Sequence, residues 1–496
     1  MTRREAARYP GPHPRFHELW QSLTATWDVW SSMHAGREHI QRLMEQRLRE
    51  SIAWARGHSS FYRQLYRGLP PGECRIDDLP VVTKHDLMAH FDTVVVDPDV
   101  TDQCVREFLA QEDCVGRPLL DRYAVWTSSG TTGEPGVFVH DGRALAIYEA
   151  LEVLRFRRLT SPAMLAAASI ADDRYAFVGA TGGHFAGNAS VERLRSLYPW
   201  LADRMRVFSI LESARVLSRR LNEYQPTLLA TYPTAASLLA EEQQLGRLTI
   251  QPREIWTGGE RLSSAQHARI ADAFGCKVRN DYGASEFRAI ACDCSCGTLH
   301  VNADWIVLEP VDERRRPVPA GRASHTVLLT NLANRVQPLI RYDLGDSVTW
   351  LEQPCECGSV LPAIRIEGRC DDTLAVSDAT GATVKLLPLA LTTVLEDQAG
   401  VSRFQLLQVG ASALLLRLDS QSSTADLVSR CRQTLGRFLE VQGTANVRLD
   451  IEQCTLQPHP VSGKLRRIVG RHATHRWRQQ AERQARAHPG LRPTRK

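Results

Sequence analysis

The chain has 496 residues, of which 43% are hydrophobic and 24% are charged; this balance is typical of packed globular proteins and excludes a mainly disordered chain. No run of residues approaches the roughly 20 apolar positions that cross a bilayer, and the first residues lack the apolar stretch of a secretory signal. We therefore expect a soluble cytoplasmic protein without a membrane partner, and its length predicts more than one domain.

The net charge of +5 is concentrated near the C-terminus. Residues 471–496 contain eight Lys or Arg residues and one Glu, so the other 470 residues together carry a charge of about −2. Such a body gives no reason to expect a nucleic-acid groove, because those grooves need clustered basic side chains. We interpret residues 471–496 as a solvated basic tail; contact of this tail with RNA, DNA or a membrane is the less favoured alternative.

The N-terminal part is predicted to be helical. Apolar and aromatic residues recur at helical spacing over residues 15–70. Thr83 has the features of a helix N-cap, with Asp86 three residues later in the place that Glu or Gln usually takes. We therefore expect another helix to begin directly after Thr83.

The middle of the chain, residues 123–369, alternates short apolar runs such as TLLATYP and REIWTGGE with helical stretches such as ARVLSRRLNEY. That alternation predicts an α/β fold with largely parallel strands. Beyond residue 370 the pattern changes, because FQLLQVG and ALLLRLD predict strands and TADLVSRCRQTLGRFLEV predicts a helix. We interpret this last part as a small α+β domain.

A loop rich in hydroxyls and glycines spans residues 128–136 with the sequence SSGTTGEPG. Glycines let backbone N–H groups approach phosphate oxygens, and the hydroxyls add further donors, so the loop suits a polyphosphate. It is not a Walker A loop, because no Gly-Lys-Ser/Thr follows. The alternative is a flexible polar turn without a ligand.

A second motif, DYGASE at residues 281–286, places a ring, a tight turn, a hydroxyl and a carboxylate in one loop. These groups suit a base plane, a phosphate oxygen and a Mg²⁺ ion, which prefers oxygen ligands; the alternative is an ordinary turn at a strand end. Three further motifs are RYDLGD at 341–346, GRCDD at 368–372 and PVSGKLRR at 460–467.

Together and in this order, the five motifs resemble those of the adenylate-forming superfamily of acyl-CoA synthetases, adenylation domains and luciferases. The resemblance is strongest to the phenylacetate–CoA ligase branch, which has a similar leader, SFYR followed by LPVVTKHDL, and no lysine where Gly136 stands. The resemblance implies a large N-terminal α/β domain, residues 1–369, and a small mobile α+β C-terminal domain, residues 370–470, ahead of the tail.

The resemblance also implies which residues form the nucleotide site. In chain order these are the phosphate loop, the adenine pocket, the loop of the second motif and a ribose-binding aspartate: Ser128, Ser129, Gly130, Thr131, Thr132, Gly133, Gly258, Gly259, Glu260, Tyr282, Gly283, Ser285 and Asp346. Among them, Tyr282 would stack on adenine and Ser285 would touch the α-phosphate. ATP and Mg²⁺ are the cofactors that this assignment implies.

Three further residues are implied as catalytic. Glu286 would bind Mg²⁺, Arg369 would contact the ribose or the phosphates, and Lys464 would be the lysine that the small domain delivers to the site. Asp371 would mark the hinge between the domains. Without its motif, Lys464 would be interpreted as an exposed lysine in a basic stretch.

The chemistry follows from the weakness of a carboxylate as an electrophile. Attack of the carboxylate on the α-phosphorus of ATP gives an acyl-adenylate and pyrophosphate, and the negative charge that develops is stabilised by Mg²⁺ and a lysine. No acid–base triad is needed, and GxSxG and HExxH motifs are both missing. We expect an aryl or arylacetic acid as substrate and coenzyme A as acceptor. The alternatives are a carrier-protein phosphopantetheine thiol or an amine; a homodimer stays an open option.

The acyl pocket is the least determined part of the site. The family places its floor near the segment ATGGHF, so His184 could meet the acid, although a lone histidine is more often structural. Trp126 and Tyr232 are comparable candidates for the pocket wall.

The cysteines cluster, with Cys292, Cys294, Cys296 and His300 in one stretch and a CECG sequence near residue 355. Thiolates and imidazole at such spacings suit tetrahedral Zn²⁺. Some members of the ligase branch are similar here, and that comparison favours a structural zinc site, with Cys292 and Cys296 as alternates and buried free cysteines as the other interpretation. The preferred ligands are Cys294, His300, Cys355 and Cys357.

Overall fold

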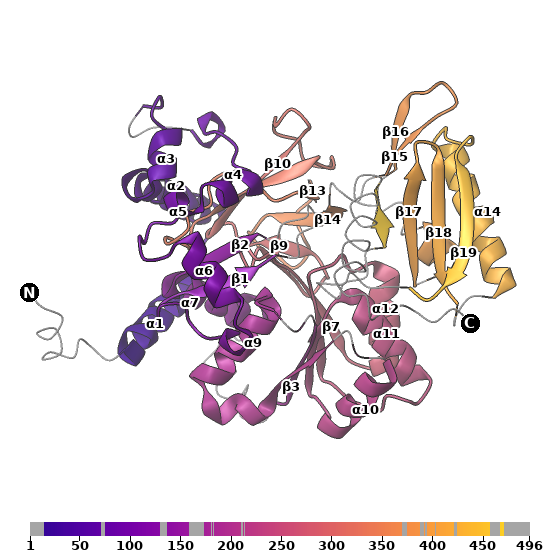
Figure 1. Ribbon diagram of the computed structural model, residues 1–496, viewed down its shortest axis with the longest axis horizontal. Coiled ribbons are helices and arrows are strands. Elements are labelled where there is room, and N and C mark those ends of the chain that lie inside the picture. The colour runs from indigo at the N-terminus through magenta and orange to yellow at the C-terminus, as the bar shows by residue number, and fades with distance from the viewer. Residues whose placement is uncertain are drawn as a thin grey trace, which may run out of the picture.

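The computed structural model describes the chain from residue 14 to residue 470 with gaps (Figure 1). The described residues are 14–70, 75–128, 136–157, 173–179, 181, 183–209, 212, 214–369, 374–386, 391, 394–401, 403–420, 424–456 and 467–470. Among these residues, no helix is both long and apolar enough to cross a bilayer.

Helices form the N-terminal part, as predicted. They are α1 (Pro14–Met33), α2 (Arg37–His58), α3 (Ser60–Leu65), α4 (Lys84–Ala89), α5 (Phe91–Val94) and α6 (Asp102–Leu109). The expected cap of α4 is confirmed: the Thr83 hydroxyl accepts the Asp86 N–H at 3.2 Å, and the Asp86 carboxylate accepts the Thr83 N–H at 2.8 Å. This reciprocal pair satisfies two N–H groups that a helix start otherwise leaves unpaired.

The centre is a sheet that, within the described residues, has nine strands in the order β13-β14-β9-β8-β7-β6-β5-β3-β4. The strands are β3 (Tyr175–Gly179), β4 (Met205–Ser209), β5 (Leu228–Thr231), β6 (Glu254–Thr257), β7 (Lys277–Tyr282), β8 (Ala291–Asp293), β9 (Leu299–Val301), β13 (Asp346–Trp350) and β14 (Ala363–Arg369). Helices α10 (Ala214–Tyr224), α11 (Pro233–Gln244) and α12 (Ser264–Phe274) lie on one side of β3–β7, and α9 (Ala186–Leu197) lies on the other (Figure 1).

The prediction of largely parallel strands is right for half of this sheet and wrong for the rest. Strands β3 to β7 run parallel, with helices as crossovers. From β7 onward the pairings β7–β8, β8–β9, β9–β14 and β14–β13 are antiparallel. The connections at 283–290 and 294–298 are too short for a crossover helix, so the chain can only turn back on itself.

Smaller elements extend the large domain. The hairpin of β1 (Ala124–Thr127) and β2 (Val137–His140) leads into α7 (Gly142–Leu151) and then a π-helical turn, η4 (Glu152–Phe156). A separate sheet holds β10 (Ile306–Val311), β11 (Thr326–Asn331) and β12 (Tyr342–Asp343). The main apolar core lies where these elements meet α1–α4 and β7–β9.

A buried charge cluster fastens the N-terminal helices to this core. The Arg155 guanidinium of η4 donates to both carboxylate oxygens of Asp304, at 2.7 and 2.8 Å. Ser32 of α1 donates to the same carboxylate at 3.0 Å, and Arg47 of α2 donates to the Asp304 carbonyl at 2.7 Å. Burial acts to raise the pKa of Asp304, but the facing Arg155 guanidinium holds that pKa below its usual value. The carboxylate therefore stays ionised and paired.

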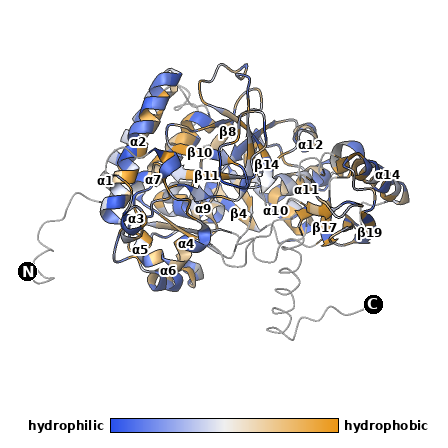
Figure 2. Cartoon of the chain, turned by 90° about the horizontal axis from the view of Figure 1, so that it is seen from above, coloured by the Kyte–Doolittle hydropathy of each residue, from blue (hydrophilic) through white to orange (hydrophobic). Residues whose placement is uncertain are grey.

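The C-terminal part has a core of its own. A mixed four-stranded sheet has the order β19-β18-β17-β20 and is covered by α14 (Ala425–Val441). Its apolar strands stand out against the polar outer surface of helices such as α2 in Figure 2. The strands are β17 (Phe404–Gly410), β18 (Ala413–Asp419), β19 (Arg448–Cys454) and β20 (Ile468–Val469), next to the hairpin of β15 (Leu374–Ser377) and β16 (Thr383–Leu386). The predicted α+β character is confirmed.

Candidate functional site

A cleft of about 1480 Å³ opens at the carboxyl ends of β5, β6 and β7. Ligands of sheets of this kind bind outside the carboxyl ends of parallel strands, where loops and helix N-termini meet. The far rim of the cleft includes Arg467 and Ile468 from the C-terminal part. The Arg467 guanidinium also reaches the Arg261 carbonyl at 3.5 Å and the Gln266 side-chain oxygen at 3.4 Å, so both parts of the chain contribute to one cavity.

The predicted nucleotide residues that the structure describes all line this cleft. They come from segments far apart in the sequence: Ser128, Gly258, Gly259, Glu260, Tyr282, Gly283, Ser285 and Asp346, together with Glu286 and the pocket candidate Tyr232. The predicted residues Ser129, Gly130, Thr131, Thr132, Gly133, Asp371 and Lys464 lie outside the described residues, as does the side chain of Arg369. Their roles stay predictions.

Three hydrogen-bonded pairs shape the part of the cleft that the predicted nucleotide residues line. The Tyr282 hydroxyl donates to the Asp346 carboxylate at 2.7 Å, which ties the end of β7 to the start of β13. The Glu260 carboxylate accepts the Thr234 hydroxyl at 2.8 Å, at the N-terminus of α11. Ser128 and Gly136 close the base of the phosphate loop, because the Ser128 N–H donates to the Gly136 carbonyl at 2.8 Å.

The turn at residues 283–287 depends on one glycine. A Cβ atom at Gly283 would lie 2.0 Å from the backbone carbonyl oxygen of Arg288. No larger residue fits without moving the backbone of the turn. This close approach directs Ser285 and Glu286 into the cleft.

A buried polar network, which sequence reasoning missed, holds the same turn from behind. Burial lowers the pKa of His140 to about 3, so its ring is neutral; the nitrogen Nε2 donates to the Ser285 carbonyl at 2.9 Å. The other nitrogen, Nδ1, lies 3.4 Å from the Tyr148 hydroxyl. Asn331 donates from Nδ2 both to that hydroxyl and to the Glu286 carbonyl, each at 2.9 Å. The backbone on both sides of the Ser285–Glu286 peptide is thus anchored.

We expect Tyr148→Phe to lower the turnover number of adenylate formation about 5- to 10-fold, with little change in the KM for ATP. The hydroxyl connects His140 to Asn331, so its loss loosens the turn without removing a group that touches substrate. Pyrophosphate release at varied ATP measures the two parameters separately. The matched control is Tyr62→Phe, whose buried hydroxyl donates to the Pro338 carbonyl at 3.1 Å. Equal turnover in the two variants would contradict the anchoring role.

The structure does not bring Trp126 and His184 to the cleft, and their placement in the acyl pocket is corrected. Trp126 is 2% exposed and its ring packs 4.1 Å from the His140 ring. His184 is 3% exposed and lies 5.1 Å from the Phe108 ring. Their neighbours Thr127 and Phe185 line the cleft instead, because side chains alternate along extended backbone.

The sequence also missed residues that line the inner end of the cleft. The rings of Phe156 and Trp256 meet edge to face at 5.3 Å there. Arg288 forms an ion pair with Glu152 of η4, and both line the cleft. Only the position of Arg288, two residues after Glu286, could have signalled this group in the sequence.

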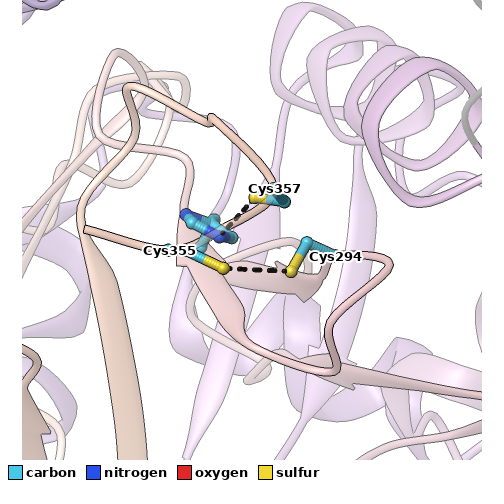
Figure 3. A group of neighbouring side chains, drawn as sticks. Cys294, Cys355 and Cys357 are labelled. Atoms are coloured by element: carbon cyan, nitrogen blue, oxygen red, sulfur yellow. Dashed lines mark hydrogen bonds between the residues drawn. The ribbon is translucent and has the colours of Figure 1, made fainter. Parts of the chain in front are cut away.

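Four side chains of metal-ligating types lie together, in the turn after β8, on β9 and in the loop before β14. Figure 3 shows the three cysteines, Cys294, Cys355 and Cys357. The thiols of Cys294 and Cys355 are 3.5 Å apart, and the Cys357 sulfur is 3.3 Å from His300 Nε2. All four donor atoms lie within 4.8 Å of one another. This spacing fits tetrahedral zinc, for which Zn–S bonds of about 2.3 Å give donor separations near 3.8 Å.

The surroundings prepare these groups for a cation. His300 Nδ1 bonds to the Leu361 carbonyl at 2.9 Å, which leaves Nε2 as the free electron-pair donor. The backbone N–H of Cys357 lowers the pKa of the Cys355 thiol to about 6. Of the alternates, Cys292 is buried in the wall of the cleft and Cys296 is exposed. The structure thus brings together the four residues that were preferred.

Comparison with protein families matches residues 118–324 to the family described as AMP-binding enzyme. The central part of the chain is thus similar to this family. A curated relative of the chain is the phenylacetate-coenzyme A ligase of Thermus thermophilus, which is 25% identical over 68% of this chain and 72% of the relative. The resemblance inferred from the five motifs is confirmed.

Solved structures share the fold of the chain. A 2-hydroxyisobutyryl-CoA ligase in the post-adenylation state matches 91% of this chain and 94% of its own, with a TM-score of 0.65 at 21% identity. The same ligase in the thioesterification state, also at 21% identity and with the same coverage, gives a TM-score of 0.53. At this identity the likeness shows the fold, and it extends over both parts of the chain.

Proposed function

We propose that the chain is an AMP-forming acid–CoA ligase that acts on an aryl or arylacetic acid. A carboxylate oxygen attacks the α-phosphorus of ATP, the bond from that phosphorus to the pyrophosphate oxygen breaks, and an acyl-adenylate forms. The thiol of coenzyme A then attacks the acyl carbonyl, loses its proton and displaces AMP. The acid is activated because the adenylate loses AMP, which is a far better leaving group than the oxide or hydroxide that the free acid would have to lose.

The observation that carries this proposal is that one cleft has both a polar wall and an apolar, aromatic wall. One wall is polar and contains Tyr282, Glu286 and Asp346, which suit a nucleotide. The other is apolar and aromatic and includes Phe156 and Trp256, which suit the ring of an acid. A carboxylate held between them would lie next to the α-phosphate, and this proximity removes much of the entropic cost of the reaction.

The described residues support separate tasks in this reaction. The Tyr282 ring offers a face for adenine, and its hydroxyl bond to Asp346 fixes its orientation. Glu286 presents a buried carboxylate beside Ser285, which fits a Mg²⁺ ion; when bound, Mg²⁺ supplies positive charge to the phosphates. The network behind the turn keeps Ser285 and Glu286 in place before substrate arrives, so little reorganisation is needed.

The cysteine and histidine cluster is proposed to bind one structural Zn²⁺ through Cys294, His300, Cys355 and Cys357. Four protein ligands leave no position open for a substrate, which separates this site from catalysis. The ion would hold the hairpin of β8 and β9 against the loop before β14. Because β8 pairs with β7 directly before the Tyr282 turn, the site supports the geometry of the cleft from its far side.

We expect pyrophosphate and AMP from the chain, ATP and Mg²⁺ only when a carboxylic acid is present, with aryl and arylacetic acids ahead of amino and fatty acids. Release of pyrophosphate across such a panel is the measurement. Coenzyme A, a carrier protein or an amine is then added separately, and the product masses identify the acceptor. Formation of ADP, or AMP formation that ignores every acid, would refute the proposal. A homodimer and a cytoplasmic location stay predictions.

A further inference from the structure

Asp281 carries a carboxylate that faces the cleft at the boundary between its two walls. It is on β7 opposite Cys292 of β8, and both side chains line the cleft. A Cβ atom at Gly258 would lie 2.2 Å from the Asp281 oxygen Oδ1. The carboxylate therefore leans over the bare backbone of Gly258, at the end of β6, and the absence of a side chain there makes room for it.

In the described part of the chain, no other side chain donates a hydrogen bond to this carboxylate. The nearest cation, Arg288, is already paired with Glu152. Glu152 and Asp293 add negative charge near Asp281. Burial, and next the charge of Glu152, raise the pKa of Asp281 to about 7. An acceptor so poorly compensated is costly inside a protein unless a ligand supplies its partner.

The walls around Asp281 indicate what kind of ligand reaches it. The rings of Phe156, Tyr175 and Trp256 surround the inner end of the cleft, with Tyr175 5.9 Å from Trp256 and Phe156 5.3 Å from it. Leu228 and Ala230 from β5 complete an apolar surface. A flat ring fits between such walls. At its border the Asp281 carboxylate, to which no other described side chain donates, can accept a hydrogen bond from that ring or from its side chain.

We propose that Asp281 is a specificity residue of the acid subsite and that the preferred acid carries an amino or hydroxyl group that donates a hydrogen bond to it. The inference rests on the proposed function and narrows its substrate class. A subsite built around a half-buried acceptor disfavours an acid without a donor, because the bound acid displaces water from the acceptor and supplies no hydrogen bond in its place. An apolar subsite, by contrast, separates such acids only weakly.

The test compares phenylacetic and benzoic acids with their amino- and hydroxy-substituted forms, by kcat/KM for pyrophosphate release. We expect the best substituted acid to exceed its parent at least tenfold in the wild-type chain. Asp281→Leu should lower this ratio roughly 30-fold, the size expected from a hydrogen bond to a charged group, and Asp281→Asn should lower it less. Comparison of the amino-substituted acids with the hydroxy-substituted acids shows which hydrogen-bond donor the site prefers.

Two controls separate recognition from damage. Lys277→Ala changes an exposed side chain at the start of β7, on the same strand as Asp281 but outside the cleft lining, and it should leave the ratio unchanged. The KM for ATP should stay within about twofold in Asp281→Asn, because a role of Asp281 toward adenine would raise it instead. Thermal unfolding shows whether each variant is folded. If Asp281→Leu does not fold, the inference is tested by the ratio in Asp281→Asn and by the ratio in the wild-type chain.

The possible results are distinct. Parent acids used as well as their substituted forms, or a ratio that survives loss of the carboxylate, would overturn this inference and leave the ligase activity intact. A KM for ATP that rises in Asp281→Asn would assign the residue to the nucleotide and likewise overturn it. If no acid in the set elicits pyrophosphate release, the proposed aryl-acid ligase falls, and the inference falls with it.

Discussion

Replacing Lys464 by alanine should slow acyl-adenylate formation roughly 10³-fold, the effect of removing a positive group from a phosphoryl-transfer transition state. Lys464 belongs to the last of the five motifs and lies three residues before Arg467. Because Arg467 lines the cleft, we predict that Lys464 reaches the bound phosphates from the same segment. Single-turnover measurement of acyl-AMP from ATP and acid gives the rate directly.

The second half-reaction is the internal control for Lys464→Ala. Thioester formation from supplied acyl-AMP and coenzyme A should fall by no more than about threefold, because no pyrophosphate leaves in that step. Lys277→Ala, which removes an exposed lysine at the start of β7, should change neither step. Equal losses in both half-reactions of Lys464→Ala would contradict a lysine that serves adenylation alone and leaves afterwards.

Loss of the cysteine and histidine cluster should produce the largest change in stability. We expect Cys355→Ser to reduce bound zinc from one per chain to near zero and to lower the free energy of unfolding by roughly 4 kcal/mol. Through the ion, Cys355 would join the loop before β14 to the β8–β9 hairpin, in addition to the β9–β14 pairing and the hydrogen bond of His300 to the Leu361 carbonyl. Metal analysis under reducing, chelator-free conditions and chemical denaturation measure the two effects.

The chain offers a matched control for that experiment. Cys296 is exposed, and its N–H lies 3.3 Å from the Cys294 sulfur, yet its own thiol is outside the four-donor group. Cys296→Ser should therefore keep both the zinc and the stability. Zinc-free protein of undiminished stability, or an equal loss in Cys296→Ser, would show that the cluster is not a structural metal site.

Local patterns in the sequence predicted many of the elements. The runs FQLLQVG and ALLLRLD correspond to β17 and β18 residue for residue, and the Thr83 cap is where its motif indicated. These features depend on neighbours a few residues apart. The direction of a strand does not depend on such neighbours, because it is set by the length of the connection between two paired strands. The antiparallel half of the central sheet was therefore missed.

Residues of the candidate site could likewise be predicted only where the signal is local in sequence. Motif residues such as Tyr282, Glu286 and Asp346 carry a signal because several functional groups are close in sequence. The network of His140, Tyr148 and Asn331 carries none, since Asn331 is far from the other two in sequence and meets them only in the fold. Trp126 shows the converse error: its neighbour Thr127 faces the cleft, and one step along a strand reverses the direction of a side chain.

The Arg155–Asp304 cluster bears on where this protein can be shortened. The family match begins at residue 118, but a fragment that starts there would lose Ser32 and Arg47 and leave a buried ion pair without its supports. Arg155 is in η4 between Glu152 and Phe156, which line the inner end of the cleft. The opening helices thus brace the inner end of the cleft from outside, and we expect substitutions there to change its shape although they do not line it.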